Sequence, residues 1–202
     1  MSARIDHAVT SGTFSLDGQT FDVDNNVWVI GDDTEVIVLD APHSVDDILA
    51  LVGDRTVRAI VLTHAHDDHC RCAPALREAT GAPILLHPDD RPLWELTHPG
   101  DTWDDDLADG QEIAIAGTTL RVLHTPGHAP GAVCLYAPDL AAVFSGDTLF
   151  HGGPGATGRS FSDRPTIESS IRARLFALPP ETVVHTGHGD DTTIAAEQAT
   201  LG

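Results

Sequence analysis

Short apolar runs rich in β-branched residues recur along the chain, separated by polar segments that contain glycine or proline. Runs of this length and composition are typical of buried β-strands. The two sequences Asp17-Gly18 and Asp24-Asn25-Asn26 predict tight turns, so the first strands are expected to form antiparallel hairpins. The runs that predict strands span residues 21–23, 27–30, 35–39, 59–62, 83–86, 113–115, 120–123, 133–136, 142–144 and 183–184.

Three other segments show the spacing of apolar positions that is typical of helices. They are residues 44–51, with Ser44 as the expected N-cap, residues 70–80, ended by Gly81, and residues 166–178, ended by two prolines. Strands and helices together predict an α/β fold. The glycine- and proline-containing stretches are too short to separate folding units, so residues 1–202 are expected to form one domain.

Composition and charge narrow the classes of function. With 11 Lys and Arg against 31 Asp and Glu, the formal net charge is −20, and no basic run could contact a phosphate backbone, so nucleic acid is not expected as a partner. No apolar stretch approaches the ~18 residues of a membrane span, and residues 1–14 lack the pattern of a signal peptide. We therefore expect a cytoplasmic protein, monomeric or homodimeric, that acts on a small molecule. Its three cysteines are too few for a disulfide framework.

Histidine is unusually abundant, with 12 in 202 residues, and four candidate ligands lie within one heptapeptide. The sequence Thr63-His64-Ala65-His66-Asp67-Asp68-His69 follows a predicted strand directly. Imidazole nitrogens and carboxylate oxygens suit zinc, iron or manganese. A loop at the end of a strand lets such closely spaced side chains converge, which makes metal binding the favoured interpretation.

Three further candidate ligands follow downstream, each beside a glycine and after a predicted strand. They are His128 in Thr-Pro-Gly-His, Asp147 in Ser-Gly-Asp-Thr and His188 in Thr-Gly-His-Gly. Together with the upstream cluster they supply seven groups. That number suits two four- or five-coordinate metals that share one carboxylate and one water.

These motifs, in this order, resemble those of the metallo-β-lactamase superfamily, and within it the glyoxalase II (hydroxyacylglutathione hydrolase) branch, from Asn26 to Thr193. The segments 146–150 and 158–160 are also similar to that branch, but the helical C-terminal domain of glyoxalase II is missing here. The resemblance implies a four-layer αββα sandwich. It also implies a partition of the ligands: one metal bound by His64, His66 and His128, the other by Asp68, His69 and His188, with Asp147 bridging.

The expected activity is hydrolysis of a small thioester, an acyl conjugate of a low-molecular-weight thiol. Two divalent ions lower the pKa of a shared water, and the resulting bridging hydroxide attacks the carbonyl carbon. Asp68 or Asp147 takes up the proton, and the thiolate leaves without acid assistance. Zinc is the expected metal, with iron or manganese as alternatives. Arg159 either binds a substrate carboxylate or braces residues 152–158.

Other interpretations remain open at this point. A persulfide dioxygenase would use a single iron bound by His64, His128 and Asp147. A lactone hydrolase would use the same metal-bound hydroxide to attack a cyclic ester. A non-catalytic domain would bind metal without turning over a substrate. True β-lactamases of the superfamily have Cys or Ser where Asp147 stands, which disfavours antibiotic hydrolysis. Cys70 and Cys72 are expected to pack in a helix, and His151 receives no assigned role.

Overall fold

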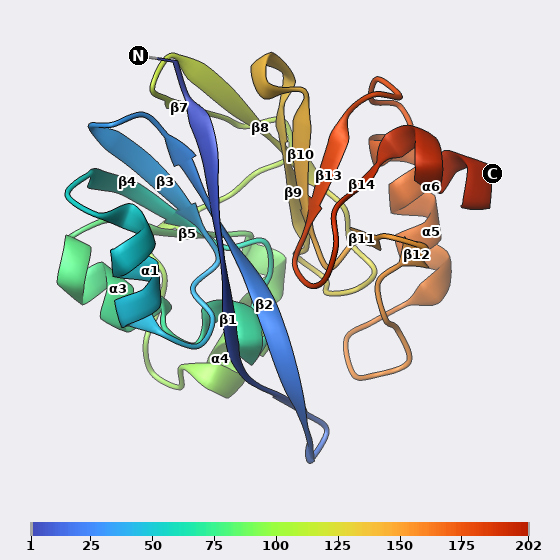
Figure 1. Cartoon of the computed structure of the whole chain (residues 1–202). Helices are drawn as coiled ribbons and strands as arrows, with labels where there is room; N and C mark the ends of the chain where they lie inside the picture. Colours follow the sequence, from blue (N-terminus) through green and yellow to red (C-terminus); the bar gives the residue numbers. More distant parts are fainter. Residues whose placement is uncertain (1, 202) are drawn as a thin grey trace.

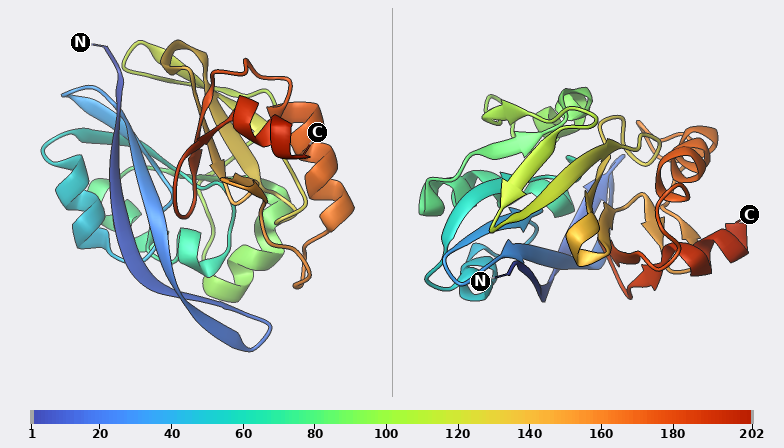
Figure 2. Two further views of the ribbon diagram at one scale, coloured as in Figure 1. Left: turned by 45° about the vertical axis from the view of Figure 1, so that its right-hand side comes forward. Right: turned by 90° about the horizontal axis from the view of Figure 1, so that it is seen from above.

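Two six-stranded β-sheets face each other at the centre of the molecule, and helices cover the outer side of each (Figure 1; Figure 2). This computed structural model describes residues 2–201. Helices α1, α3 and α4 lie beside the first sheet, and α5 and α6 lie beside the second. The four layers form the αββα sandwich that the resemblance implied, so the predicted fold class is confirmed.

The first sheet has the strand order β1-β2-β3-β4-β5-β6 and the second has the order β14-β13-β10-β9-β8-β7. The strands of the first sheet are β1 (Arg4–Leu16), β2 (Gln19–Gly31), β3 (Glu35–Leu39), β4 (Thr56–Val61), β5 (Ile84–Leu86) and β6 (Asp105–Asp106). Those of the second are β7 (Glu112–Ile115), β8 (Thr118–His124), β9 (Val133–Ala137), β10 (Ala142–Gly146), β13 (Val183–Thr186) and β14 (Thr192–Thr193). A separate two-stranded ribbon pairs β11 (Leu149–Phe150) with β12 (Gly153–Pro154).

The helical segments lie mainly in the connections between strands. They are α1 (Val45–Val52), α2 (Asp67–Cys70), α3 (Ala73–Thr80), α4 (Arg91–Thr97), α5 (Arg164–Ser170) and α6 (Ile194–Leu201), with the 3₁₀ turns η1 (Pro88–Asp90) and η2 (Pro138–Leu140) and the π-helical turn η3 (Ile171–Leu175). Ser44 caps α1 as predicted, because its side chain accepts a hydrogen bond from the backbone nitrogen of Asp47. No helix in the described part of the chain is long and apolar enough to cross a membrane.

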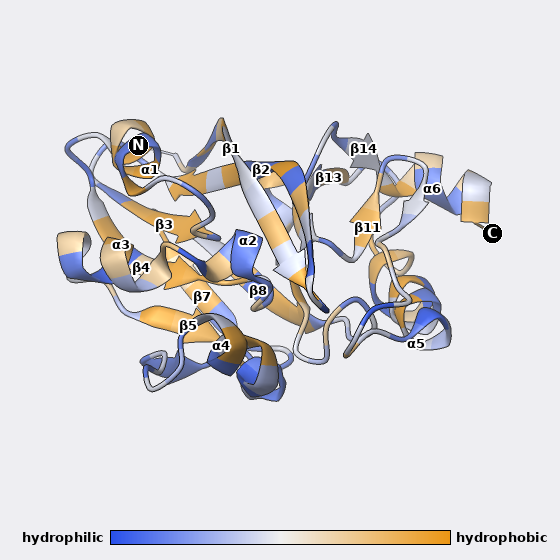
Figure 3. Cartoon of the chain, turned by 90° about the horizontal axis from the view of Figure 1, so that it is seen from below, coloured by the Kyte–Doolittle hydropathy of each residue, from blue (hydrophilic) through white to orange (hydrophobic). Residues whose placement is uncertain are grey.

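Apolar side chains from both sheets fill the space between them and hold the two sheets together. Ile37 and Val61 of the first sheet and Leu135 and Phe144 of the second belong to this buried cluster. Strands β3, β4 and β5 are accordingly mostly hydrophobic, whereas α2 is hydrophilic (Figure 3). Each fully buried side chain of this size contributes roughly 1.5–3 kcal/mol to the free energy of folding. The core therefore fixes where the strand ends, and the loops that follow them, lie in space.

The predicted turn at residues 24–26 is wrong, because β2 runs without a break from Gln19 to Gly31. It pairs along its whole length with β1, a strand whose exposed, polar character concealed it from the pattern of apolar runs. The asparagines are held in the strand by long-range hydrogen bonds. Asn26 donates through its backbone nitrogen to Gly187 O (2.8 Å) and through its side chain to Thr186 O (3.0 Å). The predicted turn at Asp17-Gly18 is present.

Two of the predicted helices have other boundaries. The segment 70–80 is divided into α2 and α3, and α2 begins at Asp67, so Asp68 and His69 lie on a helical turn and not in a loop. Pro74 stands in the first turn of α3, where its missing N–H costs nothing, and it accounts for the break. The last long helix begins at Arg164, capped by Asp163, and changes to π-helical geometry at Ile171.

Candidate metal centre

All seven of the predicted ligands lie together at one edge of the sandwich, where strands of both sheets end. Residues 64 and 66 follow β4, Asp68 and His69 lie on α2, and the other three follow or lie between strands of the second sheet. Their ligand atoms form two adjoining groups that could each hold a metal ion, and a third group of His64, His69 and Asp147 overlaps both. The structure thus brings together residues that are up to 124 positions apart, as the difference between 64 and 188 gives.

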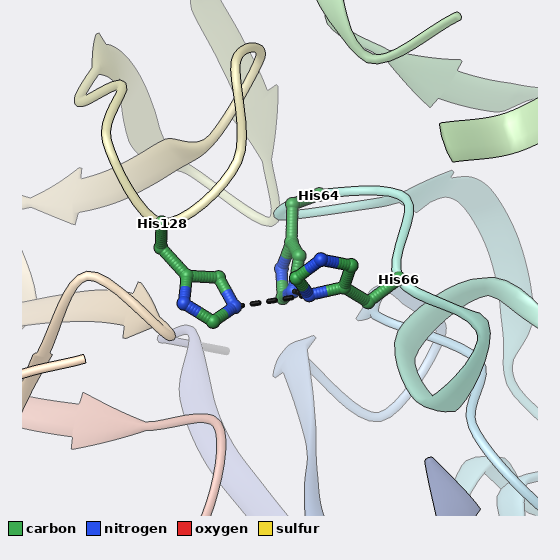
Figure 4. A group of neighbouring side chains, drawn as sticks. All are labelled: His64, His66 and His128. Atoms are coloured by element: carbon green, nitrogen blue, oxygen red, sulfur yellow. Dashed lines mark hydrogen bonds between the residues drawn. The ribbon is translucent and has the colours of Figure 1, made fainter. Parts of the chain in front are cut away.

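The first group consists of three imidazoles that point toward one another (Figure 4). His66 Nδ1 lies 3.0 Å from His64 Nε2 and 3.0 Å from His128 Nε2. Burial lowers the pKa of all three histidines, to about 3 for His66. These rings are therefore neutral at physiological pH, which is the form that binds a metal.

The second group combines two imidazoles with a carboxylate. Asp68 Oδ2 lies 3.3 Å from His188 Nε2 and 3.7 Å from His69 Nε2, and the two histidine nitrogens are 3.3 Å apart. His69 and Asp68 are almost completely buried, whereas His188 is about a quarter exposed. Asp68 and His188 line the pocket described below, whereas His69 does not.

Asp147 joins the two groups. Its Oδ2 lies 3.4 Å from both His128 Nε2 and His188 Nε2, and its Oδ1 lies 3.3 Å from His69 Nε2. A glycine makes this approach possible, because a Cβ at Gly187 would lie 2.3 Å from Asp147 Oδ1. Asp147 thus occupies the position that the resemblance implies for a bridging ligand.

The second group contains a carboxylate and the first does not, and nearby carboxylates raise the pKa of both histidines in the second group. Burial acts to lower the pKa of His69 and of His188, but Asp147 and Asp68 outweigh it. The pKa of His188 is raised to about 10, and that of His69 lies well above its usual value. Burial likewise acts to raise the pKa of Asp68, but His69 and His188 lower it to about 2. Protons on the two histidines therefore supply the positive charge that the carboxylates require.

The donor set fits divalent cations. A tetrahedral ion with bonds of about 2.1 Å needs ligand atoms about 3.4 Å apart. The distances from His66 to the other two atoms of the first group, and those among the three atoms of the second group, are 3.0–3.7 Å. Asp147 Oδ1 is buried and accepts no hydrogen bond in the described part of the chain, but it faces His69 Nε2 at 3.3 Å. A buried carboxylate oxygen requires a nearby cation, which is either the protonated ring or a metal ion. Imidazole and carboxylate together suit zinc, iron or manganese.

Hydrogen bonds to the far side of the rings orient most of the histidines. His128 Nδ1 donates to Ala156 O (2.8 Å), and His188 Nδ1 donates to Asp24 O (2.7 Å). Bonds of this kind select the tautomer whose other nitrogen is free to bind a metal.

Asp40 is a functional residue that the sequence pattern did not reveal. One of its carboxylate oxygens accepts a hydrogen bond from His69 Nδ1 (2.8 Å), and the other accepts from Thr63 N (2.7 Å). It follows the apolar strand β3, at a left-handed φ of 62°. An acidic residue at the end of a buried strand was the available signal, but only the pairing of β3 with β4 places it beside the ligand loop.

Asp90 is a second such residue, and it joins two ligand loops. Its carboxylate accepts hydrogen bonds from the backbone nitrogens of Ala65 (2.8 Å) and Gly131 (2.5 Å). It is completely buried, and burial raises its pKa to about 7 although both hydrogen bonds oppose the shift. No local pattern indicates this role, because both partners are backbone groups distant in sequence.

A cavity of about 200 Å³ opens onto the two groups of ligands. Five of the predicted ligands line it, namely His66, Asp68, His128, Asp147 and His188, together with Phe14, Phe21, Val23, Ala156, Arg159, Ser160 and Ser162. The cavity thus places ionisable groups and an apolar wall around the same space, which is the usual composition of a small-molecule site.

Arg159 lies in the wall of this cavity. Its guanidinium carbon is 4.5 Å from the ring centre of Phe21 and 5.1 Å from that of Phe14, a cross-strand pair near the β1–β2 turn. Its Nη1 is buried and has no hydrogen-bond acceptor among residues 2–201. No hydrogen bond joins the guanidinium to residues 152–158 there, so the described contacts give no support to the bracing role.

The remaining candidates lie outside the centre. Cys70 is buried in the core on the outer side of the first sheet, and the half-buried Cys72 packs against the same cluster. Neither belongs to a group of potential ligands. His151 is exposed and does not line the cavity.

Comparison with known proteins identifies the family to which this chain is similar. The family model of the metallo-beta-lactamase superfamily matches residues 20–188. A hydroxyacylglutathione hydrolase of Pseudomonas aeruginosa (strain LESB58) is 33% identical over 171 residues, 82% of this chain and 62% of that relative. The crystal structure of TTHA1623 in a di-iron-bound form is 34% identical, with a TM-score of 0.77 over 95% of this chain and 98% of that one. That of BLEG-1 B3 metallo-beta-lactamase is 29% identical, with a TM-score of 0.79 over 94% and 97%.

Proposed function

The chain belongs to the metallo-beta-lactamase superfamily, and we propose that it is a metal-dependent hydrolase that cleaves small thioesters carrying a carboxylate. One observation carries the proposal: two adjoining groups of ligands, with Asp147 close to both, open onto a cavity that is also lined by Arg159, whose Nη1 has no partner among residues 2–201. The similarity to a hydroxyacylglutathione hydrolase supports the thioester as the bond that is cleaved.

The first group, His64, His66 and His128, would hold one ion, and the second group would hold the other, with Asp147 shared. When bound, a pair of divalent ions lowers the pKa of a water from 15.7 to about 7 and so supplies hydroxide at neutral pH. Asp68 and Asp147 are both ionised and line the cavity, so either carboxylate can accept the proton that the attacking water gives up. The leaving thiolate is stable without a proton, and the site needs no general acid opposite the carboxylates.

Arg159 determines the class of substrate in this proposal. Its guanidinium lies against two aromatic rings, and one of its buried donors has no partner in the part of the chain that the structure describes, in a protein whose net charge is −20. A carboxylate on the acyl group or on the thiol carrier would satisfy that donor in a planar, paired hydrogen bond. The apolar side chains of Phe14, Phe21 and Val23 would then contact the carbon chain of the substrate.

The test is a substrate panel on one preparation whose metal content is measured by elemental analysis. The panel holds thioesters with and without a carboxylate, lactones, a thiol persulfide and a β-lactam. The proposal expects two ions per chain and the highest kcat/KM for a thioester with a carboxylate.

Other outcomes would contradict the proposal. One iron per chain with uptake of oxygen from the persulfide would identify a dioxygenase. Faster turnover of lactones than of every thioester would identify a lactone hydrolase. Two bound ions with no turnover of any substrate would favour a metal-binding domain.

A further inference from the structure

Asn25 on β2 reaches into the second group of ligands, although the sequence pattern assigned it only to a turn. Its side chain is buried, with 1% of the residue exposed. The terminal nitrogen Nδ2 lies 3.2 Å from Asp68 Oδ2, 3.3 Å from His69 Nε2 and 3.5 Å from His188 Nε2. It thus contacts the ligand atom of every member of the group.

These four atoms outline a tetrahedron. The three distances among the ligand atoms are 3.3, 3.3 and 3.7 Å, and the three distances from Asn25 are 3.2, 3.3 and 3.5 Å. All six lie near the about 3.4 Å that separates the ligands of a tetrahedral ion with bonds of about 2.1 Å. The end of the Asn25 amide therefore lies at the distance of one more ligand of the second ion, in addition to the shared Asp147.

The other end of the amide is held by His43. Asn25 Oδ1 accepts a hydrogen bond from His43 Nε2 at 2.7 Å. Reversal of the amide would turn Oδ1 toward the ligand group and Nδ2 toward His43. The imidazole accommodates this change, because a neutral ring can either donate or accept at Nε2 according to its tautomer. The surroundings thus permit both orientations of the same side chain.

We propose that Asn25 is a ligand of the second metal ion and binds it through the carboxamide oxygen. In the protein without metal, Nδ2 donates to the carboxylate of Asp68. When the ion binds, the amide is reversed and Oδ1 replaces Nδ2 at the same position, since a cation requires a lone pair. The inference rests on the two-metal centre of the proposed function but not on the identity of the substrate.

The experiment compares the wild type with Asn25→Ala, Asn25→Asp and the control Thr10→Val. Thr10 is the cross-strand partner of Asn25, and its buried hydroxyl has no hydrogen-bond partner among residues 2–201, so valine changes little. Elemental analysis and competition with a chromogenic chelator give the stoichiometry and both dissociation constants. Cobalt(II) absorption reports the coordination of the second ion independently.

We expect Asn25→Ala to raise the dissociation constant of the second ion by about tenfold or more, as the loss of groups in and around metal sites does. The dissociation constant of the first ion should not change. Asn25→Asp distinguishes a ligand from a simple donor. A carboxylate keeps an oxygen ligand and adds charge, so the second ion should bind at least as tightly as in the wild type. If Asn25 only donates a hydrogen bond to Asp68, the new carboxylate repels the carboxylate of Asp68, and the affinity for the second ion falls.

Weaker binding in Asn25→Asp, or unchanged binding and cobalt spectra in Asn25→Ala, would overturn the inference while the wild type still binds two ions. A wild type that binds a single ion would overturn both this inference and the two-metal centre. The inference and the proposed substrate are tested separately. If the Asn25 variants behave as expected but no thioester is cleaved, only thioester hydrolysis is contradicted. Circular dichroism of each variant verifies that it is folded.

Discussion

The carboxylate of Asp90 accepts a hydrogen bond from the backbone nitrogen of Ala65 at 2.8 Å. Ala65 stands between His64 and His66, so the bond fixes the backbone that carries two of the three imidazoles of the first group. The second oxygen of Asp90 binds Gly131 in the loop of His128 in the same way. One buried carboxylate therefore sets the distance between the two loops that form this group.

Asp90→Ala should remove the hydrogen bonds that hold the loop of His64 and His66 and the loop of His128. Each of the two backbone donors loses its acceptor in a buried place, which costs about 1–3 kcal/mol per group in the free energy of unfolding. The first ion should bind about 10- to 100-fold more weakly, as is usual when supporting partners are lost. Urea unfolding and chelator competition measure the two effects. Glu95→Ala removes an exposed carboxylate on α4 that belongs to none of the groups of potential ligands, and it should change neither; equal effects of both variants would refute the role of Asp90.

Uptake of the second ion should depend on pH more steeply than uptake of the first. His188, with a pKa raised to about 10, and His69 are protonated near neutral pH and must each release a proton when a metal binds. The apparent affinity should therefore rise with pH, by up to tenfold per pH unit for each proton released. The imidazoles of the first group have lowered pKa values and are already neutral.

Competition titrations between pH 6.5 and 8.5 measure the two slopes, and calorimetry in buffers of different ionisation enthalpy counts the protons released. Equal slopes for the two ions would contradict the assignment of charge to the second group.

Asp147→Ala should abolish the paired centre. The residue lies within 3.4 Å of nitrogens from both groups, so its removal takes a ligand from each ion at once. We expect less than two ions per chain and a fall in kcat of at least a hundredfold. Elemental analysis and thioester turnover measure both. Asp190→Ala, an exposed carboxylate on the loop of His188, is the matched control; retained full activity in Asp147→Ala would count decisively against the proposed chemistry.

Arg159→Ala should raise KM only for thioesters that carry a carboxylate. A hydrogen bond to a charged group contributes about 1.5–3 kcal/mol, which corresponds to a rise of roughly 10- to 150-fold at 1.4 kcal/mol per factor of ten. Arg159→Lys should restore part of the affinity, because it keeps the charge but not the planar pair of donors. Arg164→Ala removes an exposed arginine paired with Glu168 and serves as the control. An equal loss for neutral thioesters would show that Arg159 has only a structural role.

Much of the fold could be predicted from local patterns. The apolar runs at 35–39 and 133–136 coincide with β3 and β9 almost residue for residue, because a buried strand needs a continuous apolar sequence whatever its partners are. β1 escaped prediction because it is a largely exposed edge strand, so its residues follow no apolar run. The break at 24–26 was predicted wrongly because the preference of Asn for turns is local, whereas the hydrogen bonds that hold Asn26 in β2 come from residues 160 positions away.

The sequence by itself determined which side chains are available for metal chemistry. Histidine and aspartate beside glycine, at the ends of predicted strands, identified seven candidates through chemistry and spacing alone. The tertiary structure decided how they are arranged: that His66 and His128 meet at 3.0 Å across 62 residues, and that Asp40, Asp90 and Asn25 support or join the centre. The physical reason is that strand patterns and turns depend on neighbours in the chain, whereas the position of a ligand atom depends on how two sheets pair and pack. Only the packed core brings the ends of distant strands so close that their ligand atoms can bind the same ion.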